Sequence, residues 1–125
     1  MAYEITISSG DLVMEAALND TTIANKLEGI LPITTTTNTW GEEIYFTIPL
    51  EEILENPQEI VEEGDLGYWP PGHAFCIFFG VTPASRGTEI RAASAVTVIG
   101  KVLGDATRFK EIQPGQVITI TLVGQ

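Results

Sequence analysis

Short segments in which hydrophobic and polar residues alternate recur along this chain, and this period of two is typical of β-strands with one buried face. Residues 3–7 and 12–18 alternate on either side of a Ser-Ser-Gly-Asp turn, which predicts a hairpin. Residues 44–48 and 117–122 alternate in the same way, with large apolar residues on the inward face. The pattern therefore predicts a protein built mainly of β-strands.

The remaining periodic segments predict one helix and two further extended regions. Capping residues precede apolar residues at helical spacing, so one clear helix is expected near Asp20–Gly29. The threonine-rich run 33–39 should be extended, because Thr is β-branched. Residues 94–103 should form a long strand with a bend or bulge at Gly100. A short turn or helix is expected over residues 104–112.

The stretch from Gly64 to Gly80 organises the chain. Pro70 and Pro71 fix their φ angles and donate no backbone hydrogen bond, so the next strand must begin after them. Residues then alternate between two faces, one with His73, Phe75, Ile77 and Phe79 and the other with Ala74, Cys76 and Phe78. Both faces are largely apolar, so we expect this strand to be covered on both sides.

About eight short strands joined mostly by short turns favour a mainly β fold, an antiparallel β-barrel that is closed or flattened. Closure is favoured because it removes exposed strand edges. One or two short helices should cap the barrel. A chain of 125 residues fits one domain with one core, so residues 1–125 are predicted to form a single domain.

The net charge of the chain limits the classes of partner that it is expected to bind. Its 17 acidic and 6 basic residues give a formal net charge of -11, whereas nucleic acids and anionic membranes are bound by clustered Lys and Arg. We therefore expect neither partner. The single cysteine cannot form an internal disulfide, and neither a signal peptide nor a membrane-spanning apolar run is found. A reducing, cytoplasmic location is the resulting expectation.

Few residues could carry metal or nucleophile chemistry. His73 and Cys76 are the only histidine and cysteine, and three residues apart on a strand they point to opposite faces, which is poor geometry for a Cys–His pair. They are also too few to hold zinc. The acidic segment 51–63 lacks the ligand spacing of a calcium loop and should be a solvated connection. We expect no metal and no cofactor.

Four segments combine into a pattern, namely Trp40-Gly41-Glu42-Glu43-Ile44-Tyr45-Phe46, Gly64-Asp65-Leu66-Gly67-Tyr68-Trp69-Pro70-Pro71-Gly72, Phe78-Phe79-Gly80-Val81-Thr82-Pro83 and Ala93-Ser94-Ala95-Val96-Thr97-Val98-Ile99-Gly100. With them the chain resembles a family of small, uncharacterised prokaryotic proteins with a cyclophilin-like β-barrel. The resemblance covers nearly the whole chain, although Val81 stands where the family pattern has proline. It implies a flattened barrel of about eight strands capped by helices, and it implies no activity.

True cyclophilins are prolyl isomerases, and their pattern includes two stretches that are missing here. One is a Phe-His-Arg strand, which supplies the catalytic arginine, and the other is Gln-Gly-Gly-Asp; neither occurs in this sequence. The resemblance therefore transfers no catalytic residue to this chain. We expect no appreciable prolyl isomerase activity.

The aromatic residues beside the Pro-Pro turn are the best binding candidates. Tyr68 and Trp69 each combine apolar area with one polar group, and their alternative role is to plug the end of the barrel. We predict that a ligand pocket involves Tyr68, Trp69, His73 and Phe75, with Arg91 as a weaker candidate. The predicted function is a binding module for a small molecule or peptide. A prolyl isomerase and an interaction or homo-oligomeric protein are the alternatives.

Overall fold

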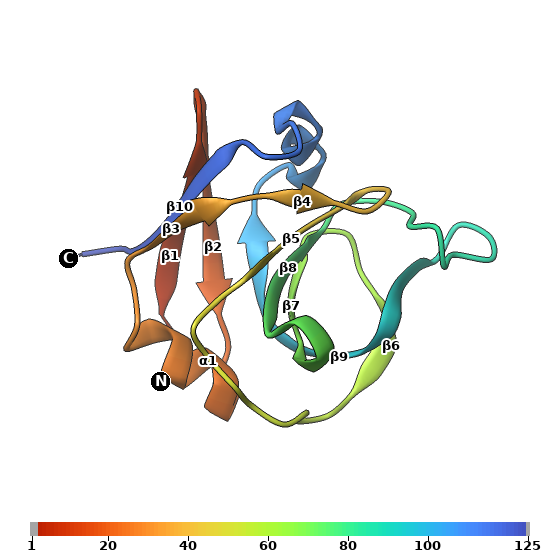
Figure 1. Cartoon of the computed structure of the whole chain (residues 1–125), viewed down its shortest axis with the longest axis horizontal. Coiled ribbons are helices and arrows are strands. Elements are labelled where there is room, and N and C mark those ends of the chain that lie inside the picture. Colours follow the sequence, from red (N-terminus) through yellow and green to blue (C-terminus); the bar gives the residue numbers. More distant parts are fainter. Residues whose placement is uncertain (1–2, 125) are drawn as a thin grey trace.

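The structure, a computed structural model, describes residues 3–124 and confirms a mainly β fold (Figure 1). Its strands are β1 (Glu4–Ser9), β2 (Leu12–Leu18), β3 (Ile33–Thr36), β4 (Asn38–Thr39), β5 (Glu43–Thr47), β6 (Gln58–Val61), β7 (Asp65–Trp69), β8 (Ala74–Phe78), β9 (Ile90–Leu103) and β10 (Val117–Leu122). Its helical segments are α1 (Thr22–Glu28) and the 3-10 turns η1 (Pro70–Gly72) and η2 (Ala106–Glu111). Within residues 3–124, no helix is long and apolar enough to span a membrane.

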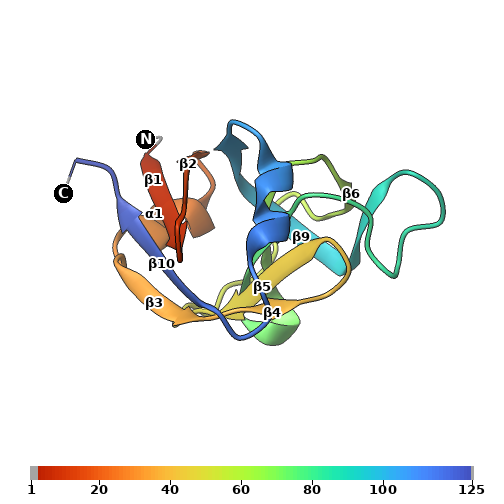
Figure 2. The ribbon, with the colours of Figure 1, turned by 90° about the horizontal axis from the view of Figure 1, so that it is seen from above.

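The strands form one antiparallel sheet in the order β3-β10-β1-β2-β9-β7-β8-β5-β4, with β6 added alongside β9. The sheet curls around an interior, as the two views show (Figures 1 and 2). Its edge strands β3 and β4 follow one another in the chain and are separated only by Thr37. They pair with β10 and β5 respectively, and the sheet does not close. A closed barrel of about eight strands is therefore not confirmed, because the described residues form a curved, open sheet of ten strands.

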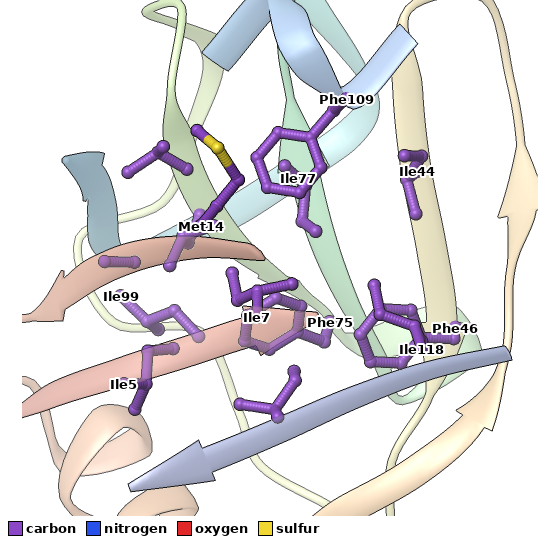
Figure 3. Packing of buried hydrophobic residues seen from close by; sticks show 14 of the residues in the cluster. Ile5, Ile7, Met14, Ile44, Phe46, Phe75, Ile77, Ile99, Phe109 and Ile118 are labelled. Atoms are coloured by element: carbon purple, nitrogen blue, oxygen red, sulfur yellow. The ribbon is translucent and has the colours of Figure 1, made fainter. Parts of the chain in front are cut away.

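A large apolar cluster, which we call the main core, fills the concave side of the sheet (Figure 3). Strands β1, β5 and β8 each contribute to it, and the rings of Phe46 and Phe75 stack with centroids 5.2 Å apart. The helical segments close its ends, since Leu27 of α1 and Phe109 of η2 are both fully buried in it. The expected helix is confirmed, and it is capped by Thr21, whose hydroxyl accepts a hydrogen bond from the N–H of Ala24 at 3.1 Å.

A second apolar cluster, which we call the outer cluster, lies on the other face of the sheet. It consists of Val61, Ala74, Cys76, Phe78, Ile90, Ala92 and Val96. Strand β6 and the first half of β9 provide this cover, and both views place them far from β1 and β10 (Figures 1 and 2). All five residues of β8 are buried, which confirms the prediction that this strand is covered on both sides.

Strand β9 reaches both clusters because it bends. It pairs with β2 near Gly100, then with β7 and finally with β6, and its register against β7 shifts between Gly100 and Val98. A Cβ atom at Gly100 would lie 2.4 Å from the carbonyl oxygen of Ala17, so only glycine fits this close approach. The expected irregularity at Gly100 is thus confirmed. The strand begins at Ile90 rather than at residue 94, because its first residues pair with β6, which lies in the segment expected to be a connection.

Candidate ligand pocket

The structure encloses two of the five residues that the sequence suggested for a ligand pocket. Tyr68 and Phe75 are both 0% exposed and belong to the main core. The Tyr68 hydroxyl donates to the carbonyl oxygen of Leu50 at 2.5 Å and accepts from the N–H of Glu52 at 3.2 Å. Tyr68 therefore ties the segment after β5 to β7, and Phe75 stacks on Phe46 in the main core.

Two other candidates, His73 and Arg91, lie in separate shallow depressions. His73 adopts a left-handed conformation with φ 47° at the end of η1, so it precedes β8 instead of belonging to one of its faces, and it lies beside Pro70. The Arg91 guanidinium pairs with Glu89 at 3.1 Å and with Glu59 at 3.6 Å. Neither residue lines the pocket that contains Trp69.

Trp69 is half-buried and borders a cavity of about 180 Å³. The cavity lies between the outward side chains of β5 and β7 and the first half of β9. The Trp69 indole N–H donates to the hydroxyl of Ser94 at 2.7 Å. The ring also lies close over η1, since a Cβ atom at Gly72 would be 3.0 Å from it. The cavity is lined by Trp40, Glu43, Tyr45, Trp69, Ala92, Ala93 and Val96. Of the five site residues predicted from the sequence, Trp69 is the one that lines this pocket.

The alternation of β5 explains how the pocket forms. Ile44 and Phe46 point into the main core, so the alternate residues Glu43 and Tyr45 face outward toward β9. Trp40 stands in the turn before β5, where its N–H donates to the carbonyl oxygen of Glu43 at 2.9 Å. Across the cavity β9 supplies two alanines and a valine. Large side chains on one wall thus face small ones on the other, and space remains between them.

Glu43 is the one ionisable carboxyl group in the pocket wall, and only 6% of the residue is exposed. Burial raises its pKa to about 7, and a hydrogen bond with the Cys76 thiol opposes the shift in part. Burial and the neighbouring Glu43 carboxyl together raise the pKa of the Cys76 thiol well above its ordinary range. No Lys or Arg side chain among residues 3–124 forms an ion pair with Glu43. The pocket therefore contains an acid that changes charge near neutral pH.

Sequence reasoning missed most of this pocket, notably Trp40, Glu43 and Tyr45. The available signal was the outward face of residues 43–47, which carries a carboxyl group and an aromatic ring. The structure pairs this strand with β8, whose two faces are both apolar. A strand that is covered on both sides implies that its neighbour β5 is at least partly covered too. The outward residues of β5 were therefore candidates for a second buried layer.

The protein is a small, curved antiparallel sheet with a pocket on its outer face, and comparison with known proteins identifies its family. The model of the Cyclophilin-like family matches residues 3–121. The chain belongs to this Cyclophilin-like family. Its structure is similar to the solution structure of the hypothetical protein AF2241 from Archaeoglobus fulgidus, with 36% identity, a TM-score of 0.80, and 95% of this chain and 93% of that chain covered. Among curated proteins, none matches.

These matches confirm the resemblance inferred from the four sequence segments. The family's name states only a likeness to cyclophilins, and the archaeal protein is itself called hypothetical, so neither match specifies a ligand or a reaction. A functional interpretation therefore has to come from the pocket itself.

Proposed function

We propose that this protein is a binding module that takes a small, largely apolar ligand into the pocket beside Trp69. The observation that supports this most is the cavity of about 180 Å³ with three aromatic residues and one buried carboxyl group in its wall. Apolar linings with a few polar groups are typical of ligand sites, and drug-sized ligands occupy about 300–1,000 Å³. The smaller volume here favours a small metabolite or one group of a larger molecule.

The two alternatives have less support. Prolyl isomerisation needs a hydrogen-bond donor placed over an apolar pocket, and the residues that line this pocket include no arginine. The sequence also lacks the two stretches typical of the isomerases. An interaction surface would favour a flat apolar patch, whereas the aromatic residues here border a hollow.

A thermal-shift screen with metabolites and short peptides tests the proposal, because a ligand that binds the folded state raises its stability. We expect some of these compounds to stabilise the wild-type protein, and we expect Ala93→Leu to abolish their stabilising effect by filling the pocket. Ala93 is exposed at the pocket, so the larger side chain does not disturb the core. Ala95→Leu is the matched control, because Ala95 lies on the same strand and lines a different depression.

Two results would contradict the proposal. One is a screen in which no compound stabilises the wild-type protein. The other is a set of ligands that stabilise Ala93→Leu as strongly as they stabilise wild type and Ala95→Leu. The second result would place binding elsewhere on the molecule.

A further inference from the structure

Three aromatic rings and one buried carboxyl group border the same small space. Trp40 comes from the turn before β5, Tyr45 from β5 itself and Trp69 from the end of β7, and Glu43 lies in the wall with them. All three aromatic residues are half-buried, so their rings are partly free to contact a ligand. The faces of aromatic rings carry partial negative charge and attract cations. Rings and carboxylate thus favour the same sign of charge in a ligand.

Among the described residues 3–124, no lysine or arginine side chain forms an ion pair with Glu43. Within residues 3–124, the lysines and arginines that form ion pairs use other carboxylates, and Lys110 pairs at 3.2 Å with Glu42, the residue next to Glu43. A buried carboxylate without a counter-charge is costly, and a cation placed beside it removes much of that cost. A cationic ligand would therefore provide the counter-charge that no lysine or arginine side chain of the described residues gives to Glu43.

The rest of the molecule favours the same ligand charge. The formal net charge of -11 creates a field that attracts cations and repels anions. The other pocket residues are Ala92, Ala93 and Val96, which suit alkyl groups better than a strongly hydrated ammonium or metal ion. Alkylated ammonium groups are both cationic and apolar at their surface, and aromatic sites recognise them through cation–π contacts.

We propose that the ligand of this pocket carries an alkylated ammonium group, which contacts the rings of Trp40, Tyr45 and Trp69 and has Glu43 as its counter-charge. This inference rests on the proposed binding function and narrows it to one class of ligand. The volume of about 180 Å³ suits such a head group with the rest of the ligand outside.

Choline and its neutral carbon analogue 3,3-dimethyl-1-butanol form a matched pair of probes, because they have nearly the same shape and differ in charge. Both tryptophans of the sequence line the pocket, so intrinsic fluorescence reports binding without a label. Near pH 8 and at low salt, we expect choline to bind tighter than the neutral analogue by about tenfold or more.

Two neighbouring variants isolate the charge. Glu43→Gln should lower the affinity for choline by about tenfold and change that for the neutral analogue by less than about twofold. Glu42→Gln removes the adjacent carboxylate, which lies outside the pocket, and should leave the preference unchanged. If Glu43→Gln fails to fold, Trp40→Leu serves instead, because Trp40 belongs to neither apolar cluster. That variant should lose most of the preference for choline.

The outcomes separate this inference from the proposed function. Equal affinities for the two probes overturn the inference and leave the pocket as a binding site. If neither probe binds but another compound stabilises wild type and not Ala93→Leu, the inference is also overturned and the pocket remains a binding site. Choline binding that persists in Ala93→Leu contradicts both. A peptide with trimethyl-lysine is titrated in parallel. Tighter binding than choline indicates that the ammonium group belongs to a modified lysine side chain, and weaker binding indicates a free small molecule.

Discussion

The main core and the outer cluster occupy opposite faces of the same sheet, and strand β8 belongs to both. Its Phe75 and Ile77 lie in the main core, whereas Ala74 and Cys76 lie in the outer cluster. The main core is made of buried apolar side chains, including the stacked pair Phe46–Phe75 (Figure 3). The outer cluster is smaller, and beside it are a buried carboxyl group and a cavity.

This difference indicates a division of roles between the two faces. Dense packing of large apolar residues gives a core most of its contribution to stability. A cavity and a buried acid each lower stability, and they persist mostly where a function needs them. The main core therefore accounts for the fold, and the outer cluster is the place where a site can be built.

The largest effect should come from removing a ring of the main core. Phe75→Ala deletes one partner of the stacked pair and leaves a cavity, so the free energy of unfolding should fall by about 3–5 kcal/mol. Cys76→Ala, at the next position on the outer face, removes one sulfur and should cost about 1 kcal/mol. Denaturant unfolding measures both. Equal losses would contradict the proposed division between the two faces.

The second effect is a dependence of stability on pH that originates in Glu43, the buried carboxyl group beside the outer cluster. The pKa of Glu43 is about 7 in the folded protein and 4.5 as its ordinary value. Between these pH values the folded state keeps a proton that the unfolded chain releases, so the free energy of unfolding falls as pH rises. The Glu43 contribution should drop by up to about 3 kcal/mol from pH 4.5 to pH 8.

Glu43→Gln and Glu42→Gln separate this dependence from that of the other carboxyl groups. Glu43→Gln should lose this decrease and be more stable than wild type near pH 8, whereas Glu42→Gln should keep it. Within residues 3–124, the titratable groups nearest Glu43 in these contacts are Cys76 on β8, which is hydrogen-bonded to it, and Tyr45 on its own strand, which lines the same pocket. Unfolding curves at several pH values provide the measurement. A wild-type slope equal to that of Glu43→Gln would show that the pKa of Glu43 is the same in the folded and the unfolded protein, so that burial does not raise it.

A third, smaller effect distinguishes a ligand contact from a packing role at Trp69. Trp69→Ala removes a half-buried ring and its hydrogen bond to Ser94, and it should cost about 1–2 kcal/mol of stability. Its effect on ligand binding should be larger, with the fluorescence or thermal shift response lost. Ser94→Ala removes only the hydrogen bond and should keep binding within about threefold. A Trp69→Ala variant that unfolds would identify the ring as a structural plug.

Much of the fold could be predicted from the sequence, because single segments carry its signals. The hairpin of β1 and β2, the helix near Asp20–Gly29 and the two apolar faces of β8 all follow from local periodicity. Local periodicity does not encode which segments cover the outer face. Strand β6 is short, and three of its four residues are exposed, so its pattern resembles a solvated connection.

The candidate pocket was harder to predict for the same reason. Tyr68 and Trp69 are adjacent in the sequence, but alternation sends Tyr68 into the main core and Trp69 to the outer face. Glu43 becomes notable only once β9 covers it. Residues chosen for their closeness to the Pro-Pro turn were therefore divided among different environments, and the pocket uses distant segments instead.

The smallest effect concerns Arg91, which the sequence suggested as a weaker site residue. Its guanidinium pairs with Glu89 and Glu59 at the margin between β6 and β9, outside the pocket. Partly exposed ion pairs contribute little, so Arg91→Ala should lower the free energy of unfolding by about 1 kcal/mol or less. Because the substitution changes no pocket residue, ligand affinity should stay within about twofold of wild type. Titration of Arg91→Ala beside Trp69→Ala makes the comparison direct. A loss of about tenfold in affinity for Arg91→Ala would show that the ligand extends beyond the pocket to the depression that Arg91 lines.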